Sequence, residues 1–206
     1  MKLNQINSFK ERLAGELPGY LAHHKVMNHR KGLHQLEGLP EGARESAVLF
    51  HLYPKNGELY TVFILRATYS GVHSAQVGLP GGKREPLDVN LQETALREAS
   101  EELNIKKEEL EILGQLSPLY VPPSNFIIYP YVSFQNSMPQ FIPQEREVDE
   151  VLQCKLSTLI DQGLQDSVVI VRSDRMKVKG YHVNDRLIWG ATAMIIKEFT
   201  EVVATL

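Results

Sequence analysis

Residues 81–105, GGKREPLDVNLQETALREASEELNI, decide the fold of this chain. The stretch begins with two glycines and a proline, which disfavour a helix, and it ends in strong helix formers. Asn90 suits the N-cap position of a helix, and Glu93 three residues later completes a pattern similar to a capping box. Beyond Asn90 the apolar residues recur at helical spacing and form one stripe. The stretch therefore predicts a loop that leads into an amphipathic helix.

The predicted helix carries an acidic face formed by Glu98, Glu101 and Glu102. Like charges at this spacing cost roughly 0.2–0.5 kcal/mol per pair, so the face does not stabilise the helix. Three glutamates alone would be typical of a solvated helix surface. Arg97, however, lies four residues after Glu93 and four before Glu101, which predicts that its guanidinium orients two carboxylates.

The glycines and the acidic face together indicate phosphate chemistry. Gly81 and Gly82 would let the backbone approach a phosphate closely. Carboxylate oxygens are hard ligands that suit Mg²⁺, which prefers a few carboxylates together with substrate phosphates. The combination predicts metal-assisted phosphoryl chemistry.

The second half of the stretch, residues 97–105 (REASEELNI), resembles the Nudix box. That pattern is Gly, five residues, Glu, seven residues, then Arg-Glu-hydrophobic-any-Glu-Glu-any-Gly-hydrophobic. Asn104 stands at the last Gly, and asparagine also tolerates the left-handed conformation. Counting from Gly82, Asp88 replaces Glu, and eight residues instead of seven lead to Arg97. The resemblance implies an α/β fold, an α/β/α sandwich around a mixed β-sheet.

The resemblance also implies roles for the site residues. Water would attack one phosphorus of a pyrophosphate, and Mg²⁺ or Mn²⁺ would lower the pKa of that water and neutralise oxygen charge. Glu98 and Glu102 are the expected principal metal ligands, and Glu101 is a third ligand or acts through bound water. Arg97 would orient the carboxylates. Glu147, at the start of a late strand, is a further candidate ligand.

The preceding loop, residues 64–82 (ILRATYSGVHSAQVGLPGG), resembles the coenzyme A pyrophosphatase branch of this superfamily. Arg66 and the run 80–82 match the pattern of that branch, whereas Gly71 stands where a second arginine is expected. The resemblance implies that Arg66 and His73 contact substrate phosphates. A surface ion pair for Arg66 and a local hydrogen bond for His73 are the alternatives.

The resemblance to this branch predicts that coenzyme A or an acyl-coenzyme A is split into 3′,5′-ADP and 4′-phosphopantetheine. Two alternatives stay open. One is an ADP-ribose or other nucleotide pyrophosphatase, and the other is a non-catalytic nucleotide-sensing module on the same fold. The complete set of Arg97, Glu98, Glu101 and Glu102 argues against the second alternative.

Composition excludes several classes of protein. The 206 residues are 43% hydrophobic, which is enough for one core, and the net charge of −3 disfavours a general nucleic-acid binder. Cys154 is the only cysteine, so an internal disulfide is excluded and a reducing compartment is favoured. No apolar run reaches membrane-spanning length. We expect a cytoplasmic protein with a small-molecule nucleotide substrate and no nucleic-acid or membrane partner. A homodimer is one option for its oligomeric state, which the sequence leaves open.

The rest of the chain predicts two parts, a lead segment (1–42) packed on a Nudix domain (43–206). The histidines of the lead segment fit no zinc pattern, so we expect surface or loop positions for His23, His24, His29 and His34. Pro130 predicts that the strand at 126–134 is an edge strand or carries a bulge. The further elements expected are helices at 3–16 and 189–203, and strands at 47–53, 59–65, 113–119, 148–156, 168–171 and 177–182.

Overall fold

The structure is a computed structural model that describes residues 1–28, 32, 40–67, 76–171 and 174–206. Its helices are α1 (Ile6–Leu13), α2 (Gly19–Val26), α3 (Leu91–Leu103), α4 (Leu156–Gln162) and α5 (Gly190–Val203), with short 3₁₀ turns η1 (Leu3–Gln5), η3 (Lys107–Glu109) and η4 (Pro122–Ser124). Its strands are β1 (Arg44–Lys55), β2 (Glu58–Arg66), β3 (Val77–Gly78), β4 (Gly81–Lys83), β5 (Glu111–Gln115), β6 (Leu119–Val121), β7 (Phe126–Phe134), β8 (Val148–Lys155), β9 (Gln165–Val171), β10 (Asp174–Val183) and β11 (Arg186–Trp189). The predictions for Gly71, His29, His34 and His73 fall outside the described residues.

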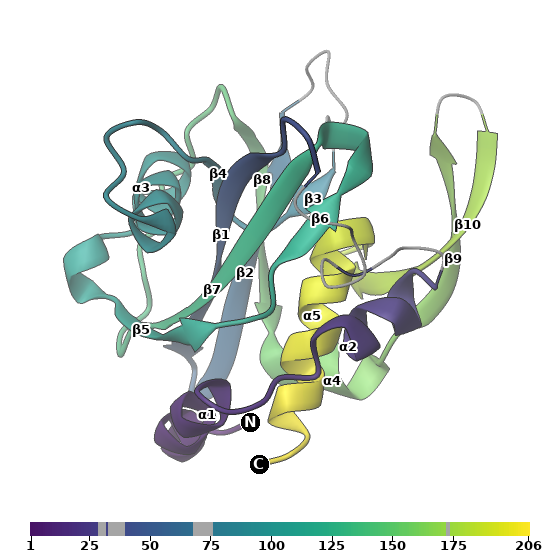
Figure 1. Ribbon diagram of the computed structural model, residues 1–206. Helices are drawn as coiled ribbons and strands as arrows, with labels where there is room; N and C mark the ends of the chain where they lie inside the picture. The colour runs from purple at the N-terminus through teal and green to yellow at the C-terminus, as the bar shows by residue number, and fades with distance from the viewer. Residues whose placement is uncertain (29–31, 33–39, 68–75, 172–173) are drawn as a thin grey trace.

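A mixed sheet lies at the centre of the molecule, between helices. Within the described residues eight strands form it, with the order β3-β2-β1-β7-β5, and β4, β6 and β8 pair with β1, β7 and β2, respectively. Helix α3 covers one face and α5 lies on the other, while β9 and β10 project as a long hairpin (Figure 1). The predicted α/β sandwich around a mixed sheet is confirmed. Among the described residues, no helix combines the length and apolar character needed to span a membrane.

The hairpin of β1 and β2 turns at Asn56 and Gly57, whose φ angles are 52° and 77°. Two successive residues with positive φ form the tight turns that match the twist of antiparallel strands. Lys55 pairs directly with Glu58 across this turn. The strands predicted at 47–53 and 59–65 are therefore present and form a hairpin, and β1 continues through Pro54 to Lys55.

Strand β7 lies inside the sheet, between β1 and the two short strands β5 and β6. The edge position predicted from Pro130 is therefore wrong. A bulge, the other alternative, is present in the pairing of β5 with β7, but its extra residue is Leu113 of β5 and not a residue of β7. Strand β6 pairs with residues 126–128 and β5 pairs with residues 131–134. Pro130 therefore lies between the residues that pair with β6 and those that pair with β5. The Leu116 N–H donates to the Pro130 carbonyl at 2.9 Å. A proline at this break removes no N–H that the antiparallel partners need.

Two other element boundaries differ from expectation. The single strand predicted at 113–119 is divided at residues 116–118 into β5 and β6, and β6 ends at Val121, just before η4. Helix α5 begins at Gly190 because Trp189 ends β11 and serves as the N-cap residue, with extended backbone. Neither change alters the layers of the fold.

The sheet buries an apolar core on each face. Small side chains of α3, Ala95 and Ala99, pack with Leu49 and Val62 on one face, which lets the helix approach the strands closely. On the other face Phe50 and Phe199 stack with ring centroids 4.2 Å apart. Burial of such a large side chain contributes roughly 1.5–3 kcal/mol. Apolar packing therefore fixes α3 on one face of the sheet and α5 on the other. The acidic residues of α3 are fixed relative to the sheet as a result.

The N-terminal segment packs on α5. The Phe9 ring lies 5.1 Å from that of Phe199, measured between centroids. His23 is buried on α2, where its Nε2 lies 2.9 Å from Oε2 of the fully buried Glu198. The expected surface or loop position is thus wrong for His23, because two helical turns are too few to show a clear apolar period. His24 is exposed, as expected. The domain boundary at residue 43 stays a prediction.

Candidate active site

Helix α3 is fixed at both ends by asparagines. The Asn90 side chain accepts a hydrogen bond from the Glu93 N–H at 2.9 Å, which satisfies a free donor of the first turn. Asn104 ends the helix in the left-handed conformation, with φ of 57°. The N-cap and the tolerated replacement at Asn104 are both confirmed. The acidic residues between them are held at defined positions along the helix.

Arg97 is anchored to the loop before α3 by Asp88. The Arg97 Nε and Nη2 donate to the two Asp88 carboxylate oxygens at 2.9 and 3.1 Å, a bidentate pair. Asp88 also accepts from the Glu85 N–H and the Thr94 hydroxyl. The Arg97 hydrogen bonds lower the pKa of Asp88 to about 2. Asp88, the residue that departs from the box, thus orients the arginine.

The rest of the Arg97 guanidinium faces the acidic side of α3. Nη1 donates to Glu101 Oε2 at 2.9 Å, and Nη2 lies 3.0 Å from Glu98 Oε1. The Lys83 carbonyl accepts a third bond at 3.1 Å. Arg97 therefore ties α3, the loop and β4 together.

Glu93 is not a partner of Arg97, so that part of the prediction is wrong. Its Oε2 lies 3.9 Å from Lys107 Nζ instead. The buried carboxylate of Asp88 offers Arg97 a two-point contact, which an exposed glutamate in the first turn does not match.

Three carboxylates meet beside α3 in what we call the carboxylate cluster, Glu98, Glu102 and Glu147. One oxygen from each lies within 4.8 Å of the others. Glu98 and Glu102 come from successive turns of α3, and Glu147 comes from the residue before β8. The structure does not bring Glu101 into this cluster, because its 57% exposed side chain turns toward Arg97.

Glu102 is the most buried member of the cluster, with 1% of its surface exposed. Its Oε2 accepts the Gly81 N–H at 2.8 Å, and its Oε1 accepts Arg66 Nη1 at 3.2 Å. Burial raises the pKa of Glu102 to about 7, and burial also raises the pKa of Glu98. Arg66 contacts a carboxylate in this structure, and its predicted contact with phosphate stays a prediction.

The two glycines are required by close contacts within the protein. A Cβ on Gly82 would lie 2.4 Å from the Glu98 carboxylate, and one on Gly81, where φ is 148°, would lie 2.3 Å from the Ala47 carbonyl oxygen. Both glycines belong to β4, which pairs with β1. Their small size therefore lets β4 and the Glu98 carboxylate approach closely, and the predicted contact with phosphate stays a prediction.

The carboxylate cluster fits a divalent cation. All its donors are carboxylate oxygens, the ligands that Mg²⁺ and Mn²⁺ prefer. Burial that raises the pKa of Glu98 and Glu102 would be offset by a cation placed among the three oxygens. Glu98, Glu102 and Glu147 are the residues that could hold such an ion.

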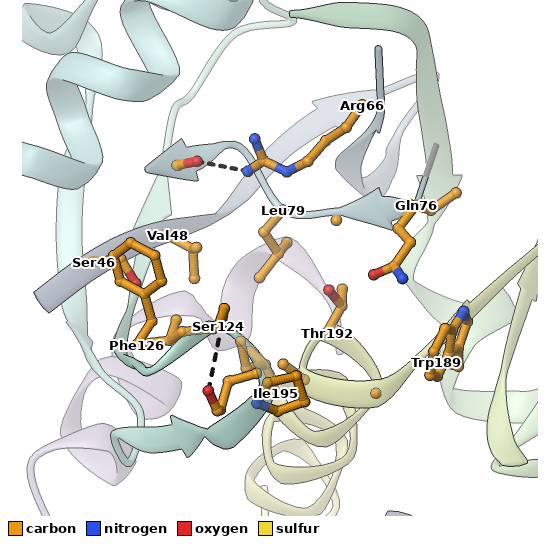
Figure 2. Close-up of a pocket in the computed structure, with 18 of the residues that line it drawn as sticks. Ser46, Val48, Arg66, Gln76, Leu79, Ser124, Phe126, Trp189, Thr192 and Ile195 are labelled. Atoms are coloured by element: carbon orange, nitrogen blue, oxygen red, sulfur yellow. Dashed lines mark hydrogen bonds between the residues drawn. The ribbon is translucent and has the colours of Figure 1, made fainter. Parts of the chain in front are cut away.

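A pocket of about 580 Å³ adjoins the cluster (Figure 2). Its lining shares Arg66, Gly81 and Gly82 with the surroundings of the cluster. The remaining lining is mainly apolar and comes from β1, β6, β7, α5 and the segments around them. It includes Met27, Val48, Leu79, Val121, Phe126, Ile128, Met176, Trp189 and Ile195.

Sequence reasoning did not identify most of this pocket. Phe126, Ile128 and Ile195 look like ordinary core residues of a strand or a helix, and only the three-dimensional arrangement brings them together at one pocket. Trp189 lies at the pocket, whereas Tyr181 is buried in the core.

Comparison with known proteins identifies the family. The NUDIX domain family matches residues 43–170. The chain is 31% identical over 164 residues to an uncharacterized Nudix hydrolase NudL of Photorhabdus laumondii, covering 79% of this chain and 87% of that protein. It is 33% identical over 129 residues to the peroxisomal coenzyme A diphosphatase NUDT7 of Mus musculus, covering 63% of this chain and 54% of that protein.

Solved structures agree on the fold. RenU, a Nudix hydrolase from M. smegmatis, superposes with a TM-score of 0.55 at 17% identity, covering 79% of this chain and 87% of that one. A MutT/nudix family protein from Enterococcus faecalis gives a TM-score of 0.54 at 19% identity, covering 99% and 75%. At such identities the likeness concerns the fold alone. With the matched domain and the first relative, these findings confirm that the chain belongs to the Nudix hydrolase family of pyrophosphohydrolases.

Proposed function

We propose that this Nudix pyrophosphohydrolase splits the diphosphate of coenzyme A or an acyl-coenzyme A, giving 3′,5′-ADP and 4′-phosphopantetheine or its acylated form. The observation that carries the proposal is the mainly apolar pocket that shares Arg66, Gly81 and Gly82 with the carboxylate cluster. A long, partly apolar arm joined to a diphosphate fits such a pair of neighbouring sites. The relative named as a coenzyme A diphosphatase, 33% identical, supports the same substrate class.

The residues of the cluster would hold the catalytic cation. Glu98, Glu102 and Glu147 supply its oxygens, since these converge within 4.8 Å. When bound, Mg²⁺ or Mn²⁺ neutralises phosphate charge and lowers the pKa of an attacking water. Arg97 keeps Glu98 in place through its contact at 3.0 Å, and Glu101 helps to hold Arg97.

The chemistry of the step is a hydrolysis in which water adds to one phosphorus. A new P–O bond forms, the bond from that phosphorus to the bridging oxygen breaks, and the two products share the protons of the water. The pocket orients the substrate by holding the arm, so that the diphosphate lies at the cluster. Polar side chains in the pocket wall besides Arg66 are Ser46, Gln76, Lys83, Ser124 and Thr192.

A substrate panel tests the proposal. Coenzyme A, dephospho-coenzyme A, an acyl-coenzyme A and ADP-ribose are compared at equal concentration with Mg²⁺ and with Mn²⁺, and the products are resolved by chromatography. We expect the coenzyme A forms to give the highest kcat/KM, with 4′-phosphopantetheine products. Equal or faster turnover of ADP-ribose would overturn the assignment to coenzyme A and leave the pyrophosphohydrolase. Binding of nucleotides without turnover of any of them would favour the sensing module.

A further inference from the structure

The end of β2 contacts two members of the carboxylate cluster at once. The Arg66 guanidinium donates to Glu102 Oε1 at 3.2 Å and to the Gly81 carbonyl at 2.6 Å. The next residue, Ala67, donates its N–H to the Glu147 carbonyl at 3.0 Å. Arg66, the last residue of β2, and the adjacent Ala67 thus bond the side chain of one cluster glutamate and the backbone of another.

The pairing of β2 with β8 is irregular at this same point. Leu65 pairs with Glu150, whereas Arg66 pairs with Val148, so Asp149 is an extra residue on β8. Such bulges bend a strand and redirect the side chains next to them. Here the extra residue lies two positions after Glu147, at the end of β8 that approaches the cluster.

Arg66 also stands between the cluster and the pocket. Its side chain is 26% exposed and lines the pocket, while its Nη atoms point away toward β4 and α3 (Figure 2). A planar guanidinium can hold a carboxylate and a carbonyl together, whereas an ammonium is a single point charge. The contact with Gly81 matters for this reason, because the Gly81 N–H bonds the other oxygen of Glu102.

We propose that Arg66 is a positioning residue for the cation site rather than primarily a phosphate ligand. It fixes Glu102 and Gly81 as a unit, and the strand end that carries it fixes Glu147. The inference rests on the proposed function, since it assumes that the cluster takes a divalent cation. It assigns to Arg66 a role in metal affinity that the side chain exerts without touching the ion.

The test measures Mn²⁺ binding to the full chain without substrate, by calorimetry and by the Mn²⁺-dependent rise in melting temperature. We expect Arg66→Gln to weaken Mn²⁺ binding roughly 10–100-fold, the range typical of groups that support metal ligands. Arg66→Lys should recover only part of the loss, because it cannot hold both partners. The matched control is Arg84→Gln, which removes a cation just after β4 that pairs with the half-exposed Glu45 of β1.

Kinetics separate this role from phosphate binding. We expect kcat of the Arg66 variants to rise toward the wild-type value as Mn²⁺ is raised, with KM for the substrate changed less than kcat. Unaltered Mn²⁺ binding with a higher KM alone would make Arg66 a phosphate ligand and overturn the inference. Loss of folding in Arg66→Lys would also overturn the inference, because Arg66 would then be required for the fold itself. Absence of Mn²⁺ binding in the wild-type chain would instead overturn the proposed function.

Discussion

The carboxylate cluster and the apolar pocket are neighbours that share Arg66, Gly81 and Gly82. In the cluster, one oxygen from each of three carboxylates lies within 4.8 Å of the others. The pocket has a volume of about 580 Å³ and is lined mainly by apolar side chains. The cluster is held by short directed bonds from arginines and backbone N–H groups. The pocket is shaped by packing between distant elements. All the cluster residues fall within the matched residues 43–170, whereas Met27, Met176, Trp189 and Ile195 of the pocket fall outside them.

This difference indicates that the cluster and the pocket have separate roles. The cluster would supply the chemistry common to the family, and the pocket would supply the preference for one substrate. Variants of the cluster should therefore change metal binding and kcat, and variants of the pocket should change KM for particular substrates.

The largest effect is expected for Glu98→Gln. Loss of one charged ligand should remove several kcal/mol of stabilisation at the reacting phosphate, which lowers kcat by about 10²–10³-fold or more. Stability without metal should hold or rise, because repulsion in the cluster is relieved, and stabilisation by Mn²⁺ should shrink. Kinetics and melting curves measure both. Glu108→Gln, an exposed glutamate of η3, is the control. Near-normal turnover of Glu98→Gln would show that the cluster is not the site of chemistry.

A smaller loss is expected for Arg97→Lys. An ammonium cannot keep the bidentate pair with Asp88 and the contacts with Glu98 and Glu101 together. We expect activity or Mn²⁺ affinity to fall roughly 10–100-fold, with KM little changed. Arg84→Lys is the matched control. An Arg97→Lys variant with wild-type kcat and metal affinity would reduce Arg97 to a surface partner of Asp88.

The cluster was easier to predict than the pocket, for a physical reason. Helix spacing alone places Glu98 and Glu102 on neighbouring turns, and Asn90 and Asn104 mark the helix ends through local backbone chemistry. The pairing of Arg66 with Glu102 depends on where β2 ends relative to α3, and no local pattern encodes that distance.

The same limit explains the errors. Pro130 was read by the local rule that proline avoids central strands, but the break between β5 and β6 accommodates it. The pocket joins Met27, Phe126 and Ile195, which are far apart in the chain and individually resemble core residues. Such sites arise from the packing of whole elements. Sequence patterns therefore predicted the layers of the fold but not the shape of the pocket that forms where elements of these layers meet.

A pH effect on stability is expected from Asp88. Its hydrogen bonds lower the pKa from 3.8 to about 2, so it contributes stability above pH 3.8 that is lost as the pH falls through about 2. Asp88→Asn should therefore be less stable than the wild type above about pH 4, with the difference fading toward pH 2. Denaturant unfolding at several pH values measures it, and Asp161→Asn, at an exposed position, is the control. A difference that stays constant down to pH 2 would contradict the charge-based account.

The smallest effect is expected at the rim of the pocket, where Met176→Ala removes part of the apolar wall. The residue is 36% exposed, so a bound arm would cover only part of it, and we expect a loss of about 1 kcal/mol, or roughly fivefold in KM. Ile170→Ala is the matched control, because Ile170 is 75% exposed and adjoins Val169, the cross-strand partner of Met176, so it points to the opposite face of the hairpin. Steady-state kinetics with coenzyme A and an acyl-coenzyme A should show a higher KM for Met176→Ala, unchanged kcat and unchanged Mn²⁺ binding. A larger increase for the acylated substrate would place the acyl group against β10. An equal change in both variants, or a fall in kcat instead, would break the proposed separation between the pocket and the carboxylate cluster.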